Sequence, residues 1–127
     1  MSWSVEHDDV LNIVVSTYAG KCTGRDFREA VAARSAMAGK LGLNKALIDA
    51  GKLEVSAAAT FDLYDIAGHY NHGANFQCTR KIAITRPDSA ESRKVVDFYE
   101  TACLNRGLDV KVFEERNSAV EWLLEEY

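Results

Sequence analysis

Four side chains that could hold a metal or move a proton recur at helical spacing in the middle of the chain. They are Asp62, Asp65, His69 and His72. At about 100° per residue these positions fall within an arc of roughly 80° on one helix face. Together they could offer nitrogen and oxygen ligands to a divalent cation, although the H-E-x-x-H pattern is missing. The alternative, which we favour, is a solvated face with a helical Asp65–His69 pair.

A single arginine interrupts the apolar face of the preceding helical segment. The apolar positions at spacings of three and four are Phe27, Ala30, Val31, Met37, Ala38 and Leu41. Arg34 projects near the centre of their arc. Because a buried guanidinium is costly unless its donors are paired, four interpretations stay open. In the first, Arg34 pairs with a carboxylate such as Asp49, and in the second its apolar stem lets the guanidinium reach water. In the third it lies in a subunit interface, and in the fourth it anchors an anionic ligand.

The other reactive groups predict little chemistry. Cys22 lies beside Lys21 and just before a predicted helix start, where a thiolate is favoured, but no histidine is near in sequence. The three cysteines form neither C-x-x-C nor a zinc spacing, and no phosphate loop or G-x-S-x-G elbow occurs. We therefore predict a protein that is not an enzyme, with no catalytic residue, no cofactor and no metal.

The composition is that of an ordinary globular protein, with 47% hydrophobic and 27% charged residues in 127. The formal net charge is −4 and the bases are scattered, which argues against nucleic acid as a partner. No apolar stretch is long enough to span a bilayer, so we expect no stable membrane insertion. No secretory leader is recognisable, which predicts a cytoplasmic protein. The length fits one domain over residues 1–127.

Hydrophobic patterning predicts the elements that must position these residues. Extended segments are expected at Trp3–His7, Val10–Tyr18, Lys45–Asp49, Lys81–Thr85 and Asp109–Glu114. Helices are expected from a Thr23 cap to about Leu41, over about Ala58–His72, from an Asp88 or Ser89 cap to about Arg106, and from an Asn117 or Ser118 cap to Tyr127. Thr23 and Asp26 resemble a capping box, and Gly42 follows the first helix where a positive φ is common.

The resulting order is β-β-α-β-α-β-α-β-α. Strands that alternate with helices require a largely parallel sheet, because parallel neighbours need helical crossovers. The opening hairpin makes the first pair antiparallel. We therefore predict an α/β fold with a five-stranded mixed, mostly parallel sheet and about four helices.

Two local patterns add a resemblance to a known family. Leu47-Ile48-Asp49 ends the third strand, and Val110-Lys111-Val112-Phe113 leads into Ala119-Val120-Glu121-Trp122-Leu123. With the element order, these patterns make nearly the whole chain resemble a STAS-like domain of the SpoIIAA-like branch. The resemblance implies a mixed sheet covered by helices and a role in binding partners rather than in chemistry. That branch has also been likened to CRAL-TRIO-type lipid-binding folds.

The chain departs from that family at its phosphorylation switch. In the anti-sigma-factor antagonists, a phosphorylatable serine directly follows the third strand within Asp-Ser-Ser-Gly. Here Asp49-Ala50-Gly51 is followed by no hydroxyl until Ser56, with Thr60 next. A phosphate on Ser56 or Thr60 would lie near a helix N-terminus, where it could reorganise the local surface. A plain capping role for these hydroxyls is the alternative that we favour.

The sequence thus predicts a regulatory or interaction domain. We expect it to bind a protein partner or itself, as a homodimer, through the second helix and the loop before it. The alternative is a carrier or sensor of a small apolar or acidic-headed ligand, lodged near Phe61, Tyr64 and Tyr70 with Arg34 as its anchor. Trp122 points away from the core face of the last helix, so it is a further candidate contact residue.

Overall fold

The computed structural model describes residues 2–55, 57–69, 81–105 and 107–125, which form one mixed sheet with helices on both faces. Its strands are β1 (Trp3–Asp8), β2 (Ile13–Lys21), β3 (Lys45–Glu54), β4 (Lys81–Thr85) and β5 (Asp109–Phe113). They lie side by side in chain order. β1 and β2 are antiparallel and the remaining pairs are parallel, which confirms the predicted fold class.

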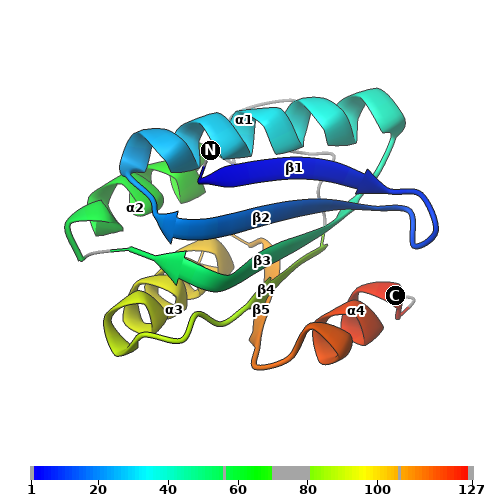
Figure 1. Ribbon diagram of the computed structural model, residues 1–127. Helices are drawn as coiled ribbons and strands as arrows, with labels where there is room; N and C mark the ends of the chain where they lie inside the picture. Colours follow the sequence, from blue (N-terminus) through cyan, green and yellow to red (C-terminus); the bar gives the residue numbers. More distant parts are fainter. Residues whose placement is uncertain (1, 56, 70–80, 106, 126–127) are drawn as a thin grey trace.

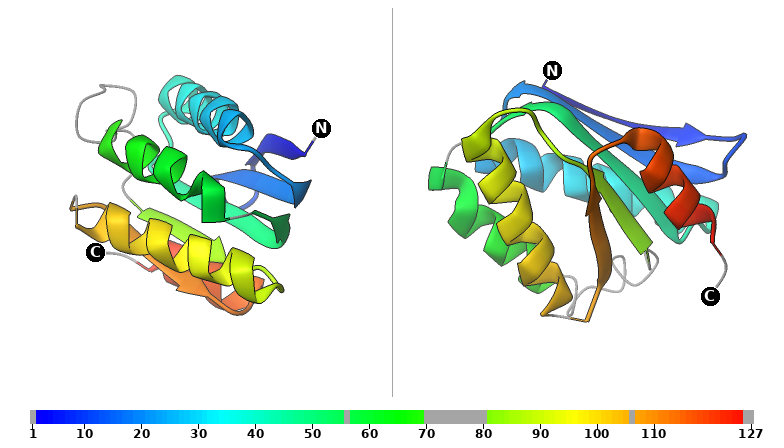
Figure 2. Two further views of the ribbon diagram at one scale, coloured as in Figure 1. Left: turned by 90° about the vertical axis from the view of Figure 1, so that its left-hand side faces the viewer. Right: turned by 90° about the horizontal axis from the view of Figure 1, so that it is seen from below.

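Three helices cover one face of the sheet and a fourth covers the other (Figures 1 and 2). The first three are α1 (Gly24–Leu41), α2 (Thr60–His69), which follows the short 3-10 turn η1 (Ala57–Ala59), and α3 (Ala90–Leu104). The fourth is α4 (Arg116–Leu124), which packs on β3, β4 and β5. The strands follow one another along the sheet in chain order, so each helix that connects two parallel strands packs next to the helix before it. As a result, α2 lies between α1 and α3.

Local signals set the helix ends as the sequence predicts. The Thr23 hydroxyl accepts a hydrogen bond from the Asp26 N–H, and the Asp26 carboxylate accepts one from the Thr23 N–H, which completes the capping box. Gly42 ends α1 with φ of 67°. Ser89 caps α3 by accepting from the N–H of Ser92.

The strand bounds differ from the prediction at the β1–β2 turn and at three strand ends: β2 runs to Lys21 rather than Tyr18, β3 runs past Asp49, and β5 ends at Phe113 rather than Glu114. Asp8 belongs to β1, and its carboxylate accepts hydrogen bonds from the N–H groups of Val10 and Leu11, so the turn lies later and β2 begins at Ile13. The third strand was predicted to end at Asp49 but continues to Glu54. Beyond a register shift at Thr17/Ala19, its last residues pair with the end of β2.

The last helix has a different start from the one predicted. Neither Asn117 nor Ser118 is its N-cap: the cap is Glu115, which makes no side-chain capping bond, and the helix begins at Arg116. Its inner side places Ala119 and Leu123 in a fully buried cluster with Leu47 and Ala83 of the sheet. Tertiary packing rather than a hydroxyl cap therefore decides where α4 begins.

The main core lies between the sheet and α1, α2 and α3. It contains buried apolar residues from all three helices, including Phe27, Val31, Leu63, Val96 and Cys103. Among the described residues, no helix has the length and apolar character needed to cross a membrane.

Candidate binding site

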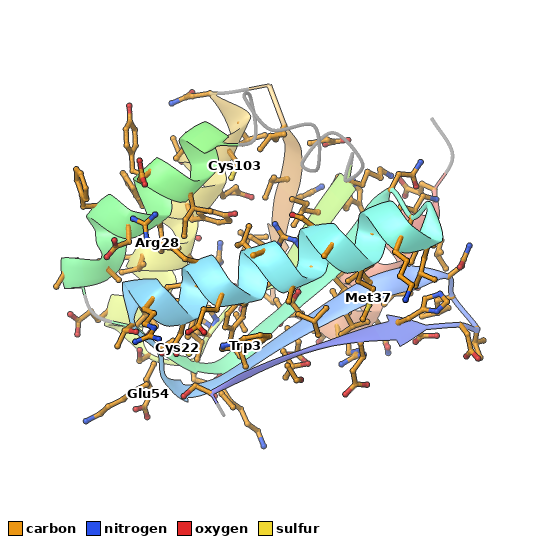
Figure 3. The ribbon with its side chains drawn as sticks, turned by 90° about the horizontal axis from the view of Figure 1, so that it is seen from above. Trp3, Cys22, Arg28, Met37, Glu54 and Cys103 are labelled. Atoms are coloured by element: carbon orange, nitrogen blue, oxygen red, sulfur yellow. The ribbon has the colours of Figure 1, made fainter. Side chains whose placement is uncertain are left out.

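Asp62 and Asp65, the two acids of the candidate metal or polar stripe, bind an arginine. Arg28 of α1 donates from Nη2 to Asp62 Oδ1 and from Nη1 to Asp65 Oδ2, each at 2.9 Å (Figure 3 labels Arg28 between α1 and α2). The hydrogen bonds to Asp62 and Asp65 raise the pKa of Arg28. A Cβ at Gly24 would overlap the Asp62 carboxylate, so glycine permits this close approach of α1 and α2.

The histidines of that stripe lie at the edge of the described part of the chain. His69 is the last residue of α2, and His72 lies outside the described residues, so the Asp65–His69 pair stays a prediction. Within the described ranges, no three His, Cys, Asp or Glu side chains gather as metal ligands would. What the geometry does show is that Asp62 and Asp65 fasten α2 to α1.

Aromatic side chains on the outer face of α2 and α3 form an exposed cluster. Phe61 is 77% exposed, Tyr64 50% and Phe98 37%. The rings of Tyr64 and Phe98 lie 6.4 Å apart between centroids. Phe61 and Tyr64 therefore point to the surface and do not line an internal ligand site as predicted, and Tyr70 lies outside the described residues. We call Phe61, Tyr64 and Phe98 the α2–α3 aromatic face.

An internal cavity of about 40 Å³ lies instead between the sheet and α1, α2 and α3, and Arg34 is in its wall. Arg34 is only 1% exposed, so the interpretation in which its stem carries the charge to water is wrong. Two tyrosines, Tyr18 and Tyr99, also line the cavity.

The proposed Arg34–Asp49 pair does not form. Asp49 Oδ2 accepts from Arg116 Nη1 at 3.0 Å, and its Oδ1 accepts from the Thr85 hydroxyl and from the Gly51 N–H. The reason is that side chains two residues apart in a strand lie on the same face of the sheet. Asp49 therefore lies on the same face as Leu47, which packs against α4. Arg34 lies on the opposite side of the sheet.

An open cleft of about 500 Å³ lies at the carboxyl ends of β2 and β3, beside the N-terminus of α3. Its walls include Lys21, Cys22, Glu54 and Ser89 (Figure 3 labels Cys22 and Glu54). Burial, and to a lesser extent the charge of Asp26, raises the pKa of the Cys22 thiol to about 11. Cys22 is therefore a thiol at neutral pH, and the lysine beside it does not make it a thiolate.

The candidate switch residues lie near the start of α2. Thr60 is the first residue of the helix and is half-buried, whereas Ser56 lies outside the described residues. Phosphorylation of either stays a prediction.

Trp122 makes contacts within the chain. Its ring lies 5.7 Å from that of Phe113, and the ammonium of Lys81 lies 4.5 Å from its centroid. Lys81 was not singled out from the sequence, although a lysine at the head of an apolar strand was a visible signal. Its Nζ donates to the backbone carbonyls of Trp122 and Glu125 at the end of α4.

Comparisons with known proteins agree with this architecture. No protein-family model matches the sequence, and no curated protein matches it either. Among solved structures, the chain is similar to an uncharacterised DUF3478-family protein with a SpoIIAA-like fold from Shewanella loihica PV-4. The identity is 21% and the TM-score 0.55, over 95% of this chain and 91% of that one. The chain therefore has a SpoIIAA-like fold, which confirms the fold that the sequence resemblance implied.

Proposed function

We propose that this chain is a single cytoplasmic STAS-like domain that acts by binding a protein partner through the α2–α3 aromatic face, without catalysing a reaction. The observation that carries the proposal is the exposure of Phe61, Tyr64 and Phe98 on adjacent helices. Contiguous exposed aromatics are uncommon on isolated domains and are enriched at interfaces. Neither Cys22 nor Cys103 forms a disulfide, which agrees with a reducing compartment.

The ion pairs of Arg28 support this proposal by holding the face in place. A partner that binds a preformed surface loses less entropy on association than one that must order it. Because Arg28 joins Asp62 and Asp65 to α1, α2 has its outward residues Phe61 and Tyr64 fixed before any contact is made. The exposed Phe61 ring would then be the central anchor of the contact.

Site-specific photocrosslinking in cells of the source organism tests the proposal. A benzophenone amino acid replaces Phe61, and in a control it replaces Val10, which is 88% exposed at the β1–β2 turn. We expect Phe61 to yield a discrete crosslinked protein that disappears when Tyr64→Ser is added, and Val10 to yield none. A product of twice the chain's mass identifies the partner as a second copy.

Equal crosslinking from both positions, or none from Phe61, would contradict the proposal. The Tyr64→Ser change is suited to this test because the side chain is half exposed, so its loss alters the surface with little effect on folding.

A further inference from the structure

The two edges of the sheet differ in how they are protected. At the β5 edge, the carboxylate of Glu100 in α3 accepts a hydrogen bond of 2.7 Å from the N–H of Val112, and β5 also carries Lys111. Covering groups and lysines commonly protect an edge strand from pairing with another chain. β1 contains neither lysine nor proline, its register with β2 is unbroken, and no strand in the described part of the chain lies beyond it (Figure 2). β1 is therefore the edge at which another strand can pair.

The hydrogen bonds between β1 and β2 show which backbone groups of β1 face outward. The carbonyl of Ser2 accepts from the N–H of Ala19, the next pair along the β1–β2 register. In an antiparallel pair, residues that bond the neighbouring strand alternate with residues whose N–H and C=O point away from it. The residues of β1 that direct both backbone groups outward are therefore Trp3, Val5 and His7.

The side chains of β1 divide between the two faces of the sheet. Trp3 and Val5 are half-buried on the face under α1, whereas Ser4 and Glu6 are exposed on the opposite face. Met37 of α1 packs on the same core cluster as Val5 and is also only partly buried (Figure 3 labels Trp3 and Met37). A strand added beside β1 would cover more of this apolar surface.

A second copy of the chain matches this edge in one register. Outward groups must meet outward groups, so Val5 can lie opposite Val5 of the second copy, with Trp3 opposite His7 on either side. Ser4 then lies opposite Glu6, where the serine hydroxyl can donate to the carboxylate. Moving the two-fold axis by one residue toward the end of β1 would place two Glu6 carboxylates opposite each other, which is unfavourable.

We propose that two copies of this chain pair through β1, antiparallel about a two-fold axis, so that their sheets become one continuous sheet. Each copy supplies the same strand, as a two-fold interface requires. The outward groups of Trp3, Val5 and His7 give about six backbone hydrogen bonds across the axis. The α2–α3 aromatic face is not part of this contact, because α3 packs on β5 at the other edge of the sheet.

Disulfide trapping tests the register. Ser4→Cys and Glu6→Cys proteins are mixed and oxidised, because the two positions would face each other with Cα atoms about 4.5 Å apart, within reach of a disulfide. Either variant alone places its two cysteines on a diagonal of about 7–8 Å, which is too long. We expect the mixture to form crosslinked dimer at least about tenfold faster than either variant alone. The unaltered chain, oxidised in parallel, gives the contribution of the native cysteines.

Sedimentation velocity measures the assembly itself, and we expect the unaltered chain to be a dimer. Val5→Pro removes an outward N–H at the axis but no bond to β2, so it should raise the dimer dissociation constant at least about 100-fold. Ser4→Glu alters an exposed side chain and places two acids opposite each other, so it should raise that constant about tenfold. If circular dichroism shows that Val5→Pro does not fold, Ser4→Glu decides. Tyr64→Ser, on the aromatic face, is the control and should change nothing.

Three results would overturn the proposal. They are a monomer at every concentration up to about 100 µM, equal trapping in the mixture and the single variants, and a dimer that Tyr64→Ser dissociates but Ser4→Glu does not. The photocrosslinking positions Phe61 and Val10 are not among the paired residues of β1. Failure of one proposal can therefore be distinguished from failure of the other.

Discussion

Two buried cations lie on opposite faces of the sheet and are accommodated in different ways. Lys81 is 4% exposed under α4, and its Nζ lies 2.6 Å from the carbonyl oxygen of Trp122. Arg34, under α1, is 1% exposed and lines a cavity together with Tyr18, Tyr99 and apolar side chains. Lys81 thus donates directly to the end of a helix, whereas Arg34 lies in a mostly apolar wall between the sheet and the helices.

The difference separates a charge that holds a helix end from one that lies beside an internal space. The carbonyls at the end of α4 are partly negative, so the ammonium stabilises the helix end and holds α4 on the sheet. Arg34, by contrast, is buried in the wall of a cavity that the sheet and the helices leave between them. Burial alone therefore does not tell what a charged side chain is for.

The largest expected effect comes from exchanging each cation for methionine. Lys81→Met removes a charged donor from the carbonyls of Trp122 and Glu125, which should lower the free energy of unfolding by about 2 kcal/mol. Arg34→Met keeps an unbranched stem that packs against the same apolar neighbours, so the loss should be smaller than for Lys81→Met. Urea denaturation measures both, with the exposed Lys111→Met as the control.

Equal losses of stability from Lys81→Met and Arg34→Met would break the distinction. Arg34 would then be a structural residue like Lys81.

An alkaline pH series sharpens the account of the cavity side. The pKa of Tyr18 is near 10 in the unfolded chain and about 12 in the fold, so between these values the unfolded state binds fewer protons. The stability that this group contributes is complete below pH 10 and falls as pH rises toward 12, by about 1.4 kcal/mol per pH unit. Tyr18→Phe should remove this part of the slope. An unchanged slope in Tyr18→Phe would show that its hydroxyl is not protected by burial.

The smallest effect is expected at a third cation, which lies at the surface. Asp65→Asn leaves Arg28 paired with Asp62 alone, and because these side chains are more than one-third exposed the loss should be about 0.5 kcal/mol. Added salt should reduce the difference from the unaltered protein. Glu29→Gln, in a more exposed pair with Arg25, is the matched control. A loss that matches Lys81→Met would mean that the α1–α2 ion pairs stabilise the fold rather than only orient α2.

Much of the fold could be predicted because its signals are local. The capping box of Thr23 and Asp26 and the positive φ of Gly42 depend on residues within one helical turn. The bounds of Lys81–Thr85 follow from a short apolar run closed by Arg86-Pro87. Helical periodicity likewise placed Phe27, Ala30 and Val31 of α1 in the core.

The candidate sites could be predicted only in part. The sequence identified Arg34 as an anomaly and Phe61 and Tyr64 as candidate contacts, but it placed all three at one site. In the structure Arg34 faces inward and the two rings face outward. Each of the two helices, α1 and α2, has one face toward the interior and one toward the surface. Only the position of the neighbouring elements decides which face is inside.

The amino-acid sequence by itself determined the order of the elements, most of their bounds and the side of each helix that is apolar, since these depend on neighbours within a few residues. The tertiary structure alone decided that Arg28 meets Asp62 and Asp65, that Asp49 bonds Arg116, and that β3 extends along β2. These contacts join residues far apart in the chain. Their formation depends on how the sheet twists and how the helices pack on it, which no local pattern encodes.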